Sequence, residues 1–144
     1  MNPDTDLEIF FPGKSRRVVR QLDFAAIRIY NTKYKSGDRD QFKSIVTVYR
    51  ETLDLLDVAK GDRVILAKDP HTGEYCIAPI PRKSNMRGNT LCGPQSWAQH
   101  FDSRLLYNKL NTGYYRLENP FRHKLSGLTF YPLTAIGNDL YSSL

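Results

Sequence analysis

The feature of the sequence that most constrains the fold is the stretch from residue 44 to residue 80, in which one hydrophobic period gives way to another. Residues 45–49 are β-branched or aromatic, with Val46 and Val48 facing one side, which is typical of a strand. Residues 50–58 instead place Leu53 and Leu56 on one face of a short helix. The stretch therefore predicts a strand that runs directly into a helix.

Two glycines divide the second half of this stretch. Gly61 supplies a turn ahead of the apolar residues 63–68, and a Pro-containing turn that ends at Gly73 leads into residues 75–78. Both apolar runs are rich in residues that favour strands. The sequence thus predicts an antiparallel sheet with one short helix packed on it.

Upstream of this unit, residues 24–30 are predicted to form a strand and residues 31–42 a polar loop. Basic and aromatic side chains interleave here, and sites that combine phosphate contact with base stacking need both types. A solvated hairpin loop would have a similar composition, since Asp38 and Asp40 lie in it. The candidate nucleic-acid-binding residues are Arg28, Lys33, Tyr34, Lys35, Arg39, Lys43 and Arg50.

Residues 46–51 (V-T-V-Y-R-E) and 55–64 (L-L-D-V-A-K-G-D-R-V) together resemble the AbrB/SpoVT-type swapped-hairpin family. The pattern of that family is an I-T-I-P-x-E strand-to-helix step, an L-L-x-L helix and a G-D-x-V turn and strand. The resemblance implies a small β module that usually completes its barrel with a second copy. It also implies DNA binding, as a transcription regulator or as the DNA-binding half of an antitoxin.

The chain departs from the family pattern at four positions. Tyr49 stands where the family has proline, and Ile45, Leu53 and Asp54 stand where many DNA-binding members carry basic residues. Any nucleic-acid contact would therefore rest on the candidate residues named above.

Beyond this module, residues 82–95 form a basic, Gly- and Asn-rich segment that we expect to be a linker. Ser96 and Gln99 then match a capping box, and Gly113 lies where a helix C-terminal cap belongs. The sequence predicts a connecting helix over residues 96–111. Its apolar stripe would comprise Trp97, Phe101, Leu105, Leu106 and Leu110.

The C-terminal region partly repeats the first half. Residues 115–119 resemble residues 27–31, and residues 126–131 resemble residues 44–49, with a helix expected over 132–140. A duplicated ββα half-unit would make the chain a pseudo-dimer, although short strand patterns also recur by chance. The expected organisation is an N-terminal arm (1–21), an AbrB-like module (22–81), a linker (82–95) and a helix with half-repeat (96–144), the last of which could share one domain with 22–81.

The composition narrows the classes of function. The net charge of +6 over 144 residues favours acidic partners such as nucleic acid. Only two cysteines are present, and with the three histidines they match no paired zinc-ligand spacing. No nucleophile elbow, phosphate loop or dinucleotide fingerprint is visible. We therefore expect no enzyme activity, catalytic residues, metal or cofactor.

The sequence shows no signal peptide and no apolar run long enough to span a membrane, so a cytoplasmic protein is expected. The predicted fold class is α+β, a small antiparallel sheet or barrel of AbrB-like type. The leading function is a non-enzymatic, DNA-binding transcription regulator that acts as a homodimer or pseudo-dimer. The alternative is a protein-interaction or assembly component, for example of a virion, that uses the β module for docking.

Overall fold

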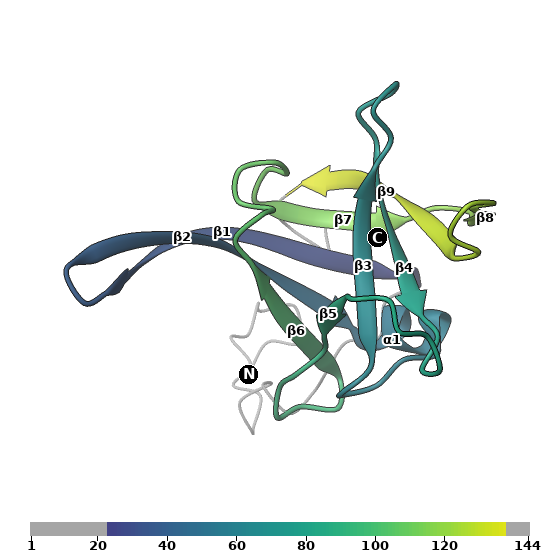
Figure 1. Ribbon diagram of the computed structural model, residues 1–144, viewed down its shortest axis with the longest axis horizontal. Coiled ribbons are helices and arrows are strands. Elements are labelled where there is room, and N and C mark those ends of the chain that lie inside the picture. Colours follow the sequence, from purple (N-terminus) through teal and green to yellow (C-terminus); the bar gives the residue numbers. More distant parts are fainter. Residues whose placement is uncertain (1–22, 138–144) are drawn as a thin grey trace, which may run out of the picture.

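The computed structural model describes residues 23–137, so the N-terminal segment expected at 1–21 lies outside the described residues. The described part is mostly antiparallel sheet with one short helix, which is consistent with the α+β class (Figure 1). Its elements are β1 (Ala26–Ser36), β2 (Arg39–Tyr49), α1 (Arg50–Leu56), β3 (Arg63–Lys68), β4 (Tyr75–Ile80), β5 (Asn89–Thr90), β6 (Ala98–Ser103), β7 (Gly113–Leu117), β8 (Phe121–Arg122) and β9 (Thr129–Gly137).

The strands form a nearly closed barrel. Their order is β5-β3-β4-β9-β7-β1-β2-β6, and β8 pairs with β9 beside this path. The barrel closes where the chain after β5 meets β6, through two backbone hydrogen bonds of 2.9 and 2.7 Å between Cys92 and His100. We call this contact the seam.

The core fills the barrel because each strand turns alternate side chains inward. Ile27 and Ile29 of β1 lie opposite Val48 and Val46 of β2, and all four are fully buried. Helix α1 adds Leu53 and Leu56 to the same core. The Thr52 hydroxyl also donates a 2.6 Å hydrogen bond to the Ala26 carbonyl, which fastens α1 to β1.

The order predicted for residues 44–80 is confirmed, since β2, α1, β3 and β4 follow one another as strand, helix and hairpin. The loop predicted at 31–42 is wrong. It is the outer part of one long β1–β2 hairpin that turns at Gly37, whose φ is +67°. Both faces of this part are exposed to solvent, so its sequence does not alternate apolar and polar residues, which is the usual signal for a strand.

The connecting helix predicted at 96–111 is wrong, because residues 98–103 form β6 and residues 104–110 form turns. Gln99 and Phe101 point into the barrel and are 4% and 3% exposed. Leu105, placed on the same helical stripe as Phe101 by the prediction, is 82% exposed. The apolar residues after β6 happen to be spaced as on a helical face. Gln99 is polar although it faces inward, so β6 lacks the alternation of apolar and polar residues that predicts a strand.

The C-terminal helix predicted at 132–140 is also wrong as far as Gly137, where β9 ends. Thr134 and Ile136 are β-branched and favour extended backbone. Strand β9 joins β4 to β7, so it closes a gap in the barrel that a helix could not close. Residues 138–140 of the predicted helix lie outside the described residues.

The half-repeat agrees with the structure in one pair of strands only. The residues equated by sequence, Ile27 and Tyr115, lie directly opposite each other in the antiparallel β1–β7 pair, as a local two-fold requires. The match between 44–49 and 126–131 is not reflected in the register. Val48 lies opposite Ile27, but Ala135, and not the equated Phe130, lies opposite Tyr115.

The segment expected as a linker, 82–95, is bound to the barrel. Its β5 pairs with β3, and Leu91 is buried in the core. The Arg63 guanidinium donates hydrogen bonds to the carbonyls of Met86, of Ser84 at 2.7 Å and of Pro81 at 3.2 Å. One arginine thus binds two points of this segment and the residue just before it, through contacts that local sequence patterns do not encode.

Gly88 brings this segment close to the β3–β4 hairpin. A Cβ at this position would lie 2.2 Å from Ile80 Cδ1 and 3.1 Å from the Val64 carbonyl oxygen. We expect Gly88→Ala to lower the free energy of unfolding by about 1–2 kcal/mol, because overpacking a filled site forces neighbours to shift. Urea denaturation should show that the double variant Gly88→Ala/Ile80→Val loses less unfolding free energy than the two single variants together, because valine lacks the Cδ1 atom that the new Cβ would meet. Additive losses would contradict this account.

An ion pair fixes the turn after α1. Arg82 donates from Nε and Nη2 to the two Asp62 carboxylate oxygens, both at 2.9 Å, and the Ala59 N–H also donates to Asp62. The hydrogen bond from Arg82 has the largest effect on the pKa of Asp62 and holds it below its usual 3.8. Burial, the next largest effect, raises this pKa, and the hydrogen bond from Ala59 lowers it further. This carboxylate therefore stabilises the fold above pH 3.8, and the stabilisation is lost as the pH falls through the lowered pKa.

We therefore expect wild type to exceed Asp62→Asn in unfolding free energy near neutral pH, with the difference shrinking as the pH drops below 3.8. Urea denaturation at a series of pH values measures this. Arg82→Met should remove most of the pH-dependent part, because Arg82 is its largest source. A difference that is constant from neutral to acidic pH would show that the charge on Asp62 is not involved.

Candidate nucleic-acid interface

The outer part of the β1–β2 hairpin stands away from the barrel (Figure 1). Strand β7 stops pairing with β1 at Ile29, and β6 stops pairing with β2 at Ser44. Beyond these points β1 and β2 pair only with each other among the described strands. We call residues 30–43 the arm; at the usual rise per residue it is about 20 Å long.

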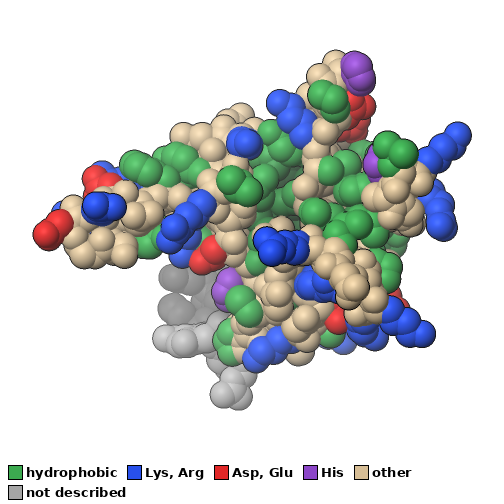
Figure 2. Space-filling view, viewed as in Figure 1, with side chains coloured by type: hydrophobic (Ala, Val, Ile, Leu, Met, Phe, Trp, Pro, Cys, Tyr) green, Lys and Arg blue, Asp and Glu red, His purple; other side chains and the backbone are tan. Residues whose placement is uncertain are grey.

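The arm carries four cations and two carboxylates. Figure 2 shows Lys and Arg side chains along the arm, with acidic side chains towards its end. The cross-strand register sorts the predicted residues by face: Arg28, Tyr34, Arg39 and Lys43 lie on the outer face, and Lys33 and Lys35 on the opposite one. Arg50 lies apart from them, at the start of α1 beyond the far end of β2.

Two of the arm's cations are already paired. Lys43 Nζ lies 2.7 Å from Asp102 on β6, and Lys33 Nζ lies 3.3 Å from Asp40. Lys35 and Arg39, near the tip, form no ion pair within residues 23–137. Lys35 and Arg39 are therefore the arm's cations that have no ion pair among the described residues, and Asp38 lies beside them at the turn.

Two of the three aromatic side chains of the arm, Tyr34 and Phe42, make contacts within the protein. The third, Tyr30, is 41% exposed. Lys43 lies over the Tyr34 ring at 4.7 Å, and the Tyr34 hydroxyl is 3.1 Å from Arg104 Nη2. On the other face, the ring of Phe42 packs on Tyr107 with centroids 5.0 Å apart. These contacts brace the base of the arm and leave the two rings less suited to stacking on bases.

Sequence reasoning missed the residues that brace the arm. Asp102, Arg104 and Tyr107 all come from the stretch that was predicted to be a helix. It also missed the surroundings of Arg28, whose guanidinium lies 5.0 Å from the Tyr30 ring and 5.9 Å from the Tyr114 ring. The alternation of Tyr114 and Arg116 was a signal that β7 would place such residues on its outer face.

The described residues hold few groups suited to covalent or metal chemistry. Burial, followed by the charges of Glu74 and Asp69, raises the pKa of the Cys76 thiol to about 11, so this thiol stays protonated at neutral pH. Among residues 23–137, no cluster of three or more His, Cys, Asp or Glu side chains could hold a metal ion. No helix in the same range has the length and apolar character needed to cross a bilayer.

The resemblance to the swapped-hairpin family remains a prediction that rests on residues 44–80. Comparison with known proteins found no matching family model, no matching curated protein and no matching solved structure.

Proposed function

We propose that this protein binds nucleic acid, and specifically the phosphate backbone of duplex DNA, through the arm. The observation that carries the proposal is a cation-bearing, two-stranded ribbon that projects beyond the barrel. A ribbon of this kind fits the major groove of B-DNA, which is about 12 Å wide and admits two paired strands. Lys35 and Arg39 at its tip would then meet the phosphates first.

The occupied rings favour a duplex over a single strand. Single-strand binders present free aromatic faces on which successive bases stack. Here Tyr34 lies under Lys43 and Phe42 packs on Tyr107, so these two rings stiffen the arm. A stiff, charged ribbon is better suited to a regular duplex backbone than to unstacked bases.

Fluorescence anisotropy tests the proposal directly. The full-length protein is titrated into a labelled duplex of about 20 base pairs and into each of its single strands, from about 50 to about 200 mM salt. We expect tighter binding to the duplex, with an affinity that falls log-linearly with salt because bound phosphates release counterions. The absence of binding to duplex at the lowest salt would exclude this function.

A second candidate function, protein docking or assembly, is favoured by the unpaired edges of the arm. Among the described residues, neither edge has a strand partner beyond Ile29 or Ser44, and Phe42 is 43% exposed. An exposed strand edge can pair with a strand of another chain. Light scattering after size exclusion distinguishes the candidates: a stoichiometric protein complex that forms without nucleic acid and survives high salt supports docking.

A further inference from the structure

The two faces of the arm differ in what covers them. On the inner face, opposite the outer one, the Asn31 side chain donates a 2.7 Å hydrogen bond to the Leu110 carbonyl and accepts one of 3.3 Å from the Asn108 backbone N–H. Phe42 packs on Tyr107 from the same face. The turns after β6 therefore cover the base of the inner face, where they would stand between the arm and a duplex.

The two faces also differ in charge near the tip. On the inner face, Asp40 lies opposite Lys35 and 3.3 Å from Lys33 Nζ. On the outer face, Arg39 lies opposite Ser36, and the two strands of the arm supply no carboxylate. A polyanion therefore meets less repulsion from the arm on its outer face. Cover and charge together make the outer face the one that would lie against a duplex.

Gln41 is an amide on this outer face. It lies opposite Tyr34 and is partly exposed, and within residues 23–137 its side chain makes no hydrogen bond. Its polar neighbours on the same face are engaged, since Lys43 pairs with Asp102 and the Tyr34 hydroxyl is 3.1 Å from Arg104 Nη2. Gln41 therefore offers both a donor and an acceptor to a bound molecule.

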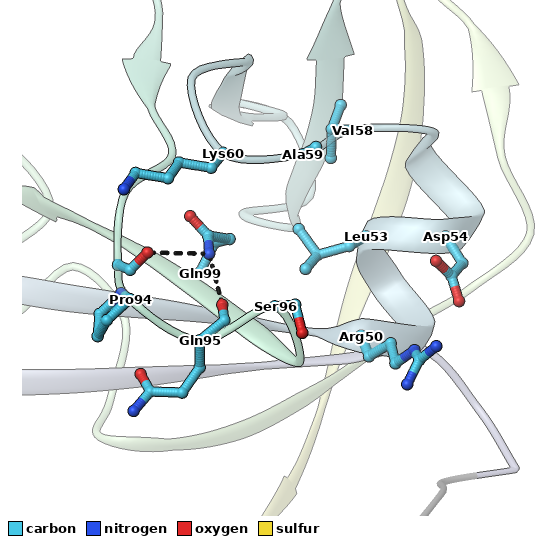
Figure 3. A pocket seen from close by; sticks show the side chains of 11 residues that line it. Arg50, Leu53, Asp54, Val58, Ala59, Lys60, Pro94, Gln95, Ser96 and Gln99 are labelled. Carbon is cyan, nitrogen blue, oxygen red and sulfur yellow. Dashed lines mark hydrogen bonds between the residues drawn. The ribbon is translucent and has the colours of Figure 1, made fainter.

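Other amide side chains of the barrel hold its own loops instead. Asn31 binds the turns after β6, as described above. In Figure 3 the Nε2 of Gln99 donates to the carbonyls of Gly93 at 3.3 Å and of Gln95 at 2.6 Å. Removing either amide would disturb the fold, whereas removing that of Gln41 breaks no contact among the described residues.

We propose that the arm lies in the major groove with its outer face towards the base edges, and that Gln41 reads an adenine there. A glutamine can donate from Nε2 to adenine N7 and accept at Oε1 from the adenine N6 amino group. No other base presents this pair of groups in the major groove. The inference rests on the proposed function and adds sequence preference to it, since phosphate contacts alone carry no sequence information.

The test is a selection from duplexes with a randomised centre of roughly 10 base pairs, because an arm of about 20 Å spans about six base pairs. Full-length wild type and Gln41→Met, which keeps the side-chain length and lacks the amide, each select binders that are then sequenced. The preferred duplex is remade with 7-deazaadenine at the enriched adenine, which removes N7 and keeps the base pair. Anisotropy then compares the affinities for the two duplexes.

We expect wild type to enrich one A·T pair and to bind about fivefold or more weakly when that pair is replaced by another. The 7-deazaadenine duplex should bind about threefold or more weakly, because one hydrogen bond is lost. Gln41→Met should bind the two duplexes equally and keep the salt slope of wild type, since Gln41 carries no charge. Gln95→Met, a change at an exposed glutamine beside the other end of β2 (Figure 3), should behave as wild type.

The outcomes separate this inference from the proposed function. Duplex binding without any sequence preference, or a preference that Gln41→Met retains, would overturn the reading of adenine by Gln41 and leave the proposed function standing. Failure to bind any duplex at low salt would overturn both.

Discussion

Replacing Phe101 by alanine is expected to lower the free energy of unfolding by about 3–5 kcal/mol, the usual cost of truncating a buried phenylalanine. Phe101 is 3% exposed on β6 and lies opposite the fully buried Val46, so the change leaves a cavity in the barrel. A loss of this size is a large fraction of the roughly 5–15 kcal/mol that stabilises an ordinary domain. Equilibrium urea denaturation, followed by tryptophan fluorescence, provides the measurement.

Leu105→Ala is the matched control. Leu105 is 82% exposed, so its truncation should change the unfolding free energy by less than about 0.5 kcal/mol. The helical stripe predicted from sequence would instead bury both residues and make both changes costly. Similar large losses in the two variants would therefore contradict the strand at 98–103.

The second large effect is expected at the tip of the arm. The double change Lys35→Gln/Arg39→Gln should lower the magnitude of the salt slope of duplex binding by about 2, since each lost phosphate contact contributes about 0.9. At about 0.1 M salt the same loss corresponds to an affinity on the order of 50-fold weaker. The anisotropy titration described above measures both quantities.

Two controls separate the arm from general positive charge. Arg122→Gln/Lys124→Gln removes the same charge from exposed positions away from the arm, and should change the slope little. Lys43→Gln should have a smaller effect than the tip changes, because Lys43 is already paired with Asp102. If the double change at residues 122 and 124 weakens binding as much as the change at the tip, the arm is not the binding site.

Sequence reasoning succeeded where one local period determined the structure. In residues 44–80 the alternating apolar residues, the face of Leu53 and Leu56, and the turn glycines all agree, and β2, α1, β3 and β4 follow them. It failed where the burial of one residue depended on distant partners. Gln99 is polar but faces the core, because its amide donates hydrogen bonds to the loop at residues 93–95. The sequence does not reveal these contacts, so β6 was not predicted.

The candidate interface was likewise predictable only in part. The sequence located the basic arm between residues 33 and 43, but not the pairing that decides which cations are free. Asp102 and Tyr107 reach the arm from β6 and the turns after it, more than fifty residues away in sequence. Gln99 Oε1, which is buried and has no donor within residues 23–137, also had no sequence signal, since its burial results from long-range packing.

The barrel should open more easily at the seam than between β1 and β2. Among the described segments, Cys92 and His100 are the seam's only backbone-paired residues, whereas β1 and β2 are joined through ten such pairs. Local opening follows the weakest contacts, so the amides of Cys92 and His100 should exchange with solvent deuterium faster than those of Ile29 and Val46. An opening there would also loosen the loop at residues 93–95, which Gln99 holds, while the β1–β2 hairpin stays intact.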